Sequence, residues 1–199
     1  MNRMNVDERR AKLIEAAIEV MLRDGVSRTT TRSIVQQAGM TTGAFHYCFF
    51  SKEELELEVI RVLNARAFDA LLAQVSTDVN GPEIIDRVAA AYVDSLVLEA
   101  PQRQLTFELT LHALRQPNLR DAAVKHYRVK FDGAEEFLDA MANAGGFRWR
   151  LPTSDLARLA LGLAEGIAFQ WVVTDEHPTP ARLHDALVAF LRSQVAESS

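Results

Sequence analysis

The sequence predicts an all-α protein with a small N-terminal three-helix unit and a larger C-terminal helical bundle. Apolar residues recur at helical spacing through most of the 199 residues. No stretch shows the sustained period-two alternation of a β-strand. Glycine and proline clusters divide the chain into segments of helical length. These breaks give three N-terminal helices and about six more.

The first predicted helix spans residues 8–24 and ends at Gly25. Ile14, Ile18 and Met21 recur at the i, i+4, i+7 spacing of one helical face, with alanines between them. We expect this face to pack across the two short helices that follow and so complete a three-helix unit.

Two short helices joined by a tight turn come next. The first, residues 29–38, is followed by Gly39, and glycine readily takes the positive φ that ends a helix. The second begins after Thr41, whose hydroxyl suits an N-cap. Phe45 and Phe49 are four residues apart and therefore share its inward face. A helix, a glycine turn and a short helix form the helix-turn-helix arrangement, whose second helix enters the DNA major groove.

A long helix is predicted to begin at Lys52. Ser51 and Glu54 have the spacing of a capping box. We expect the helix to continue to about Asp78, a length of roughly 40 Å. The sequence Asn80-Gly81-Pro82 then breaks it.

Further breaks divide the rest of the chain into helices. They lie at Pro101, Gln116-Pro117-Asn118, Gly145-Gly146, Pro152 (with Thr153 and Ser154 as candidate N-caps) and His177-Pro178-Thr179-Pro180. In the last of these, Thr179 suits an N-cap and Pro180 the first helical position, where its missing N–H costs nothing.

Residues 29–55 resemble the DNA-binding domain of the tetracycline-repressor (TetR) family of bacterial transcriptional regulators. The matching residues are Thr29, Thr30, Ile34, Ala38, Gly39, Thr41, Gly43, Phe49, Lys52 and Leu55. His46 stands where the family usually has a phosphate-contacting tyrosine, and Tyr47 follows directly. The resemblance implies a helix-turn-helix domain in residues 1–51 and a ligand-binding and dimerisation domain in residues 52–199.

We expect DNA contacts from the outer face of the two short helices and from their flanks. Hydroxyls and cations suit phosphate oxygens, and Gly43 lets the backbone approach the duplex closely. The candidates are Arg28, Thr30, Thr31, Arg32, Thr41, Thr42, Gly43, His46, Tyr47 and Lys52. Thr30 and Thr41 also suit helix caps, and His46 also suits an inert surface position. Arg9 and Arg10 fit a solvated face better than an arm that reaches DNA.

Charge is distributed unevenly along the chain. Residues 1–52 hold eight Lys/Arg and five Asp/Glu, whereas residues 53–199 hold fourteen and twenty-two. A basic head on an acidic body is typical of a DNA-binding module attached to a body that does not bind DNA. No apolar run approaches the roughly 18 residues of a membrane span, and the N-terminus lacks an apolar signal core. The single Cys48 suits a reducing cytosol, so we expect a cytoplasmic location without a membrane partner.

The last two predicted helices, residues 156–171 and 181–195, are apolar on more than one face. Such helices form either the core of a monomer or a four-helix interface with a second copy. The resemblance favours a homodimer, because the family dimerises through its last two long helices. The candidate interface residues are Leu156, Leu159, Leu163, Ile167, Leu183, Leu187, Phe190 and Leu191.

The resemblance also implies a cavity for a small-molecule effector of unknown identity, built around residues 83–144. Candidate lining residues are Tyr92, Phe107, Glu108, His112, Tyr127, Phe169 and Gln170, with Phe131 and Trp171 as further apolar walls. Glu108 and His112 share a helical face, where a surface ion pair is the simpler interpretation. An apolar or amphipathic organic molecule suits such a lining.

The sequence contains no recognisable catalytic or metal-binding motif. The five histidines form neither H-E-x-x-H nor the E-x-x-H pairs of a di-iron bundle, and there is no G-x-S-x-G, G-x-G-x-x-G or P-loop. We therefore expect no enzyme activity, cofactor or metal.

The sequence is thus interpreted as a ligand-responsive regulator, a repressor that binds a near-palindromic double-stranded operator as a homodimer and is released by a small molecule. The alternatives are an activator, and an all-α small-molecule-binding or interaction protein that does not bind DNA.

Overall fold

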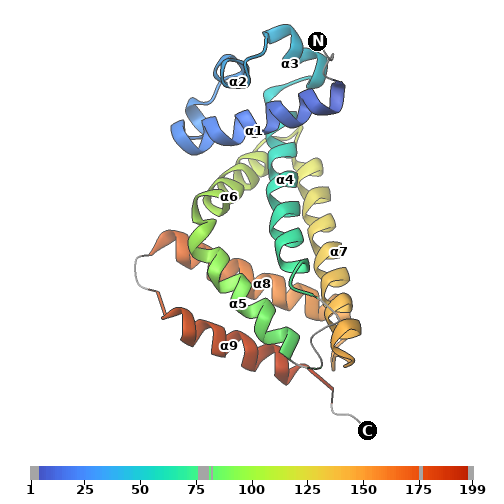
Figure 1. The fold of residues 1–199 in the computed structure, drawn as a ribbon. Coiled ribbons are helices and arrows are strands. Elements are labelled where there is room, and N and C mark those ends of the chain that lie inside the picture. The colour runs from blue at the N-terminus through green and yellow to red at the C-terminus, as the bar shows by residue number, and fades with distance from the viewer. Residues whose placement is uncertain (1–4, 76–80, 82, 175–176, 197–199) are drawn as a thin grey trace. The chain divides into compact units, whose positions relative to one another are not determined.

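A computed structural model describes residues 5–75, 81, 83–174 and 177–196 (Figure 1). Within these residues the chain forms nine α-helices and one short 3-10 helix. Extended pairing in the described part is limited to an isolated bridge between Trp149 and Val195. The predicted all-α fold is confirmed.

The chain divides into two compact units. The first unit consists of residues 1–64 and 104–126, and the second of residues 65–103 and 127–199. The domain boundary at residue 51 stays a prediction, because these compact units do not test it. The hydrophobic core of the first unit joins Leu13, Ile34 and Phe45 of the N-terminal helices to Leu55 and Leu109 from later in the chain.

The first unit begins with the predicted three-helix arrangement. Its elements are α1 (Val6–Asp24), the 3-10 helix η1 (Val26–Arg28), α2 (Thr31–Ala38), α3 (Thr42–Cys48) and the first part of α4 (Lys52–Leu72). Gly25 and Gly39 end α1 and α2 with φ of +85° and +62°, as predicted from their positions.

Local capping explains where α2 and α3 begin. The Thr30 side chain accepts a hydrogen bond from the Ser33 N–H at 3.1 Å, and the Ser33 hydroxyl oxygen accepts from the Thr30 N–H in return. The Thr41 hydroxyl oxygen accepts from the Ala44 N–H at 3.2 Å. These contacts satisfy amide groups that the first turn of a helix otherwise leaves without partners.

Two details of α4 differ from the prediction. The Ser51 hydroxyl oxygen accepts from the Glu54 N–H at 3.2 Å, but the Glu54 carboxylate accepts from the Phe50 N–H at 2.8 Å rather than from Ser51, so half of the capping box forms. The helix ends at Leu72, about 32 Å from its start. The predicted end at Asp78 lies outside the described residues.

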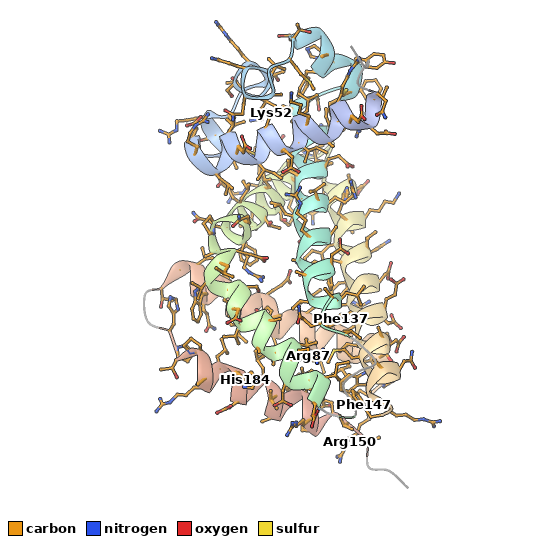
Figure 2. The ribbon with its side chains drawn as sticks, viewed as in Figure 1. Lys52, Arg87, Phe137, Phe147, Arg150 and His184 are labelled. Carbon is orange, nitrogen blue, oxygen red and sulfur yellow. The ribbon has the colours of Figure 1, made fainter. Side chains whose placement is uncertain are left out.

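The second unit contains the end of α4, α5 (Glu83–Leu98), the N-terminal residues of α6 (Ala100–Arg115), most of α7 (Arg120–Gly145), and α8 (Thr153–Val173) and α9 (Pro180–Ser193). Helix α5 packs along α9, where His184 Nε2 lies 3.2 Å from the Asp86 carbonyl oxygen and Arg192 pairs with the Asp86 carboxylate (Figure 2).

The predicted breaks separate these helices, with one correction. The Thr179 side chain caps α9 and Pro180 is its first residue, as predicted. Thr153 and Ser154 are not the N-cap of α8, because Pro152 occupies that position without a side-chain cap. The Pro152 carbonyl accepts from the Asp155 N–H at 3.0 Å, so the backbone alone starts the helix.

The connection between α7 and α8 is tied to the C-terminal segment. The Trp149 indole N–H donates to the Leu138 carbonyl at 2.9 Å, and the Phe147 ring meets the Trp149 ring edge-on. The Arg150 N–H donates to the Gln194 carbonyl at 2.7 Å. These contacts set where α8 begins.

Helix α8 corrects the expectation that no apolar run reaches membrane length. By length and composition it is long and apolar enough to cross a bilayer, with a mean hydropathy of 1.4 over 18 residues, 22% of which are buried within the chain. The same properties belong to a helix that packs against other helices in a protein core, so composition alone is weak evidence for a span.

Candidate DNA-binding interface

Helix α3 presents a polar surface on an apolar base. Phe45 and Phe49 are almost fully buried, as predicted. Thr42, Gly43 and His46 are exposed on the opposite side, and Tyr47 retains 66% of its accessible surface. A short helix anchored from behind with free polar groups in front can enter a DNA groove without unfolding.

Gly43 has no packing role within the chain. A Cβ atom built at this position meets only the Thr41 hydroxyl oxygen, at the ordinary contact distance of 3.8 Å. Glycine inside a helix costs about 1 kcal/mol relative to alanine. An alanine would fit the free protein at this position, so packing within the described residues does not require glycine.

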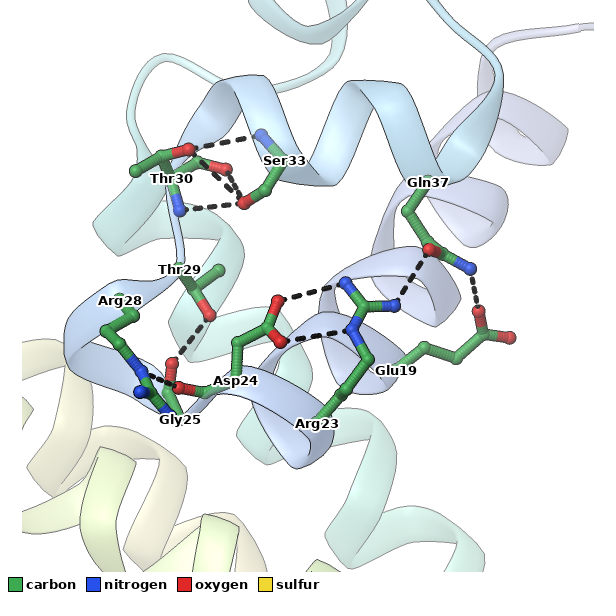
Figure 3. A network of polar contacts seen from close by, with 9 residues as sticks. All are labelled: Glu19, Arg23, Asp24, Gly25, Arg28, Thr29, Thr30, Ser33 and Gln37. Atoms are coloured by element: carbon green, nitrogen blue, oxygen red, sulfur yellow. Dashed lines mark hydrogen bonds and ion pairs between the residues drawn. The ribbon is translucent and has the colours of Figure 1, made fainter.

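A network of polar contacts holds the turn that precedes α2 (Figure 3). The buried Thr29 hydroxyl donates to the Gly25 carbonyl at 2.8 Å. Arg28 Nε donates to the Asp24 carbonyl at 2.5 Å, so this candidate also serves the C-terminus of α1. The exposed N-terminus of α2, with Thr30 and Arg32, is thereby held against α1.

A second chain of contacts in the same region joins α1 to α2 (Figure 3). Arg23 forms a two-pronged ion pair with Asp24 and donates to the Gln37 side-chain oxygen at 3.1 Å. Gln37 in turn donates to the Glu19 carboxylate at 2.6 Å. The hydrogen bond from Arg23 lowers the pKa of the Asp24 carboxyl below its ordinary value.

Lys52 has a different environment from the one predicted. Its ammonium donates to the Thr29 carbonyl at 2.8 Å, contacts the Val26 carbonyl at 3.5 Å and pairs with the Glu56 carboxylate at 3.1 Å. Three-quarters of its side chain is buried. An ammonium has three donors, and all three face the protein at this site. We therefore leave Lys52 out of the proposed interface and assign it to holding η1 against α4.

Sequence reasoning missed two residues beside α3. Arg10 donates to the Cys48 carbonyl, and its guanidinium carbon lies 4.2 Å from the centre of the Phe49 ring. A cation at the C-terminus of α3 complements the helix dipole there. Phe50 is 95% exposed directly after α3.

The candidate interface residues of the last two helices fall into three sets by exposure. Leu156, Leu183 and Leu187 are buried in the chain itself, whereas Leu159 and Leu163 remain 54% and 39% exposed. The others, Ile167, Phe190 and Leu191, are half-buried. The exposed part of α8 continues through Gly162, Gly166, Phe169 and Val173.

The seven candidate effector residues are divided between the two units. Phe107, Glu108 and His112 belong to the first unit, and Tyr92, Tyr127, Phe169 and Gln170 belong to the second. The predicted pairing of His112 with Glu108 is wrong. His112 Nε2 instead lies 3.8 Å from the buried Glu56 carboxylate, and Glu108 is exposed.

A polar cluster in the second unit contains two of these candidates and residues that sequence reasoning missed. The Tyr127 hydroxyl and the Lys130 ammonium both donate to the Glu165 carboxylate of α8. The Tyr92 hydroxyl donates to the neighbouring Ala164 carbonyl, and burial raises its pKa to about 12. One carboxylate in the middle of an otherwise apolar helix was the signal for this cluster.

Known proteins resemble this chain at the levels of motif, sequence and fold. Residues 13–59 match the family described as bacterial regulatory proteins, tetR family. The nicotine-responsive transcriptional repressor HdnoR of Paenarthrobacter nicotinovorans is 26% identical over 192 residues, covering 94% of this chain and 95% of its own length. The uncharacterised regulator YfiR of Bacillus subtilis is 25% identical and covers 85% and 83%.

Solved structures show the same fold over nearly the whole length. The multidrug binding protein EbrR complexed with malachite green superposes with a TM-score of 0.63 at 25% identity, covering 96% of this chain and 99% of that one. The same protein complexed with ethidium gives 0.65 at 24% identity, covering 92% and 97%.

The proteins matched by sequence are transcriptional regulators rather than enzymes. Together, the matching motif, the full-length relatives and the arrangement of α1, α2 and α3 show a DNA-binding domain of the tetR family in residues 13–59 and support a DNA-binding transcriptional regulator.

Proposed function

We propose that the chain is a cytoplasmic repressor that binds a near-palindromic operator as a homodimer, without catalysing a reaction. The observation that carries the proposal is the exposed face of α3, with Thr42, Gly43, His46 and Tyr47 on a buried aromatic base. Two such helices, one per subunit, would read two half-sites about one helical turn apart. Bound over a promoter, the dimer would exclude the transcription machinery.

Dimerisation is proposed to use the exposed side of α8 together with α9. Leu159, Leu163, Phe169 and Val173 leave an apolar stripe in water along α8. Gly162 and Gly166 lie within it, and a Cβ atom built at either meets nothing within 4 Å. An apolar stripe interrupted by small residues suits close packing of helices in a two-fold interface.

The effector is proposed to be a small organic molecule bound by the second unit. HdnoR is nicotine-responsive, and EbrR has been crystallised with malachite green and with ethidium. To release DNA, the effector must bind the DNA-incompetent conformation more tightly, by a few kcal/mol for a strong response. A molecule that binds both conformations equally would leave the operator occupied.

The proposal is tested by selecting fragmented genomic DNA with the purified protein and titrating the best fragment against salt. We expect enrichment of a near-palindromic site, and an affinity that falls steeply as salt rises, because phosphate contacts release counterions. Tyr47→Ala is the matched variant, since Tyr47 is exposed and its loss leaves the core intact. Failure to enrich any fragment, with or without added small molecules, would reject the repressor function in favour of a binding protein that does not contact DNA.

A further inference from the structure

Four helices of the second unit bring one carboxylate together with three aromatic rings and three cationic side chains. We name this group the Glu165 cluster. It consists of Glu165 and Arg158 from α8, Tyr127, Lys130 and Phe131 from α7, Arg103 from α6 and Tyr92 from α5. Charge and aromatic surface therefore meet in one place within the second unit.

Glu165 is held by two donors at the centre of the cluster. Its Oε1 accepts from the Lys130 ammonium at 2.6 Å, and its other carboxylate oxygen accepts from the Tyr127 hydroxyl. The side chains of Glu165 and Lys130 retain only 22% and 15% of their accessible surface. A pair so far from bulk water interacts more strongly than one on the surface. Glu165 therefore has a strong electrostatic preference for a cation beside it.

Each aromatic ring of the cluster has a cation over its face. Lys130 Nζ lies 5.8 Å from the centre of the Tyr127 ring. The guanidinium carbon of Arg103 lies 5.5 Å from the Tyr92 ring, and that of Arg158 lies 4.5 Å from the Phe131 ring. Ring faces attract cations through their quadrupole. The cluster is thus an environment that favours positive charge, and in the free protein the cationic side chains of the chain itself occupy it.

Of the three cations, Lys130 is the one that pairs with the Glu165 carboxylate, so a cationic ligand at Glu165 must replace it. Arg103 is also bound to the Ser95 hydroxyl at 2.5 Å and paired with Glu99 at 3.5 Å, so it has a structural role within α5 and α6. The ammonium of Lys130 is a strongly hydrated point charge on a flexible four-carbon stem, so it can turn to solvent when a cationic ligand takes its place at Glu165. Removing it leaves Glu165 with the Tyr127 hydroxyl and uncovers the ring face of Tyr127, beside the Phe131 ring over which Arg158 lies.

We propose that the effector is an organic cation that displaces the Lys130 ammonium from Glu165 and lies against the rings of Tyr127 and Phe131. This inference rests on the proposed function, in which the second unit binds the effector. Charge is balanced throughout: Glu165 is neutralised by Lys130 in the free protein and by the ligand in the complex, while Lys130 moves into water. An anion would have to lie beside the carboxylate, which repels it.

The test measures binding of two fluorescent probes to the full-length protein without DNA: ethidium, an aromatic cation, and N-phenyl-1-naphthylamine, an uncharged aromatic. Glu165→Gln keeps the shape of the side chain and removes its charge. We expect it to weaken ethidium binding about tenfold or more, the usual cost of a lost charge-assisted contact, and to change binding of the uncharged probe less than about twofold. Lys130→Met is expected to tighten ethidium binding several-fold, because it removes the competing cation.

A matched control separates charge from packing. Tyr127→Phe keeps the ring and removes the hydroxyl that donates to Glu165. We expect ethidium binding to change by less than in Glu165→Gln, because the carboxylate and the ring face both remain. A thermal melt and retained binding of the uncharged probe verify that each variant is folded.

The outcomes distinguish this inference from the function on which it rests. Unchanged ethidium affinity in Glu165→Gln, or weaker ethidium binding in Lys130→Met, would overturn the cation assignment. If the uncharged probe alone released the operator, the repressor would stand and the cation assignment would fall. If the operator itself were not bound, the proposed function would fail, whatever the probes did.

Discussion

The two compact units differ in how several of their cationic side chains are held. In the first unit, Arg10, Arg28 and Lys52 donate to the backbone carbonyls of Cys48, Asp24 and Thr29. In the second unit, Lys130 and Arg158 meet a carboxylate and aromatic rings. Carbonyl contacts fix the backbone of short helices, whereas contacts between side chains can be exchanged for a ligand. The first arrangement suits a rigid surface that reads DNA, and the second suits a binding site that rearranges when a ligand binds.

The largest effect is expected at the exposed apolar face of α8, which contributes to neither the DNA-reading surface nor the Glu165 cluster. Leu163→Asp places a charge within the apolar stripe formed by Leu159, Phe169 and Val173. We expect the variant to be monomeric, because burying an unpaired carboxylate in an interface costs several kcal/mol. Light scattering coupled to size exclusion measures the mass. Ala11→Asp, at an exposed position on α1 of the first unit, is the control for a charge added elsewhere. A dimer that persists in Leu163→Asp would show that another surface pairs the subunits.

The next largest effect is a loss of folding stability on replacing Lys52. Lys52→Met leaves the buried Glu56 without its cation and frees the Thr29 carbonyl, so we expect the free energy of unfolding to fall by about 3 kcal/mol. Urea denaturation measures it. The double variant Lys52→Met with Glu56→Leu should recover part of the loss. If stability were unchanged and only DNA affinity fell, Lys52 would be a phosphate contact after all.

At Tyr47 the expected change lies in binding and not in folding. Tyr47→Ala removes an exposed phenol that can donate to phosphate, so operator affinity should fall about tenfold. The midpoint of thermal unfolding should stay within about one degree of the wild type, since surface changes are usually small. The Tyr47→Phe variant keeps the ring, so its affinity shows how much the hydroxyl alone contributes to DNA binding. Equal affinity of all three proteins would remove Tyr47 from the interface.

The smallest effect is expected at Gly43, where stability and binding should change in opposite directions. Gly43→Ala should raise the free energy of unfolding by up to about 1 kcal/mol, because alanine fits the free protein and favours the helix. Operator affinity should nevertheless fall, since the added methyl group would meet the approaching DNA backbone. Parallel denaturation and DNA titrations measure both quantities. Tighter or equal DNA binding would mean that glycine at this position has no role in recognition.

Features encoded by neighbouring residues were predictable from the sequence. Gly39 ends α2 with positive φ, Thr41 caps α3 and Thr179 caps α9, because each effect involves residues within one turn of helix. The buried pair Phe45 and Phe49 followed from helical spacing alone.

Features that join distant parts of the chain were not predictable in this way. Lys52 reaches the Thr29 carbonyl across 23 positions, and Arg10 reaches the Cys48 carbonyl across 38. The Glu165 cluster likewise joins residues 35 and 38 positions apart. Spacing within a helix shows which face a residue occupies, but not which other helix meets that face.

The most direct test of the central claim, that the exposed face of α3 reads operator DNA, is a fluorescence anisotropy titration of a selected genomic site at several salt concentrations. Wild-type protein is compared with Tyr47→Ala on the selected site and on a scrambled duplex of equal length. We predict that wild-type protein prefers the selected site by at least about a thousandfold and that Tyr47→Ala reduces affinity for it. Equal binding to the two duplexes, or identical titrations for the two proteins, would contradict the claim.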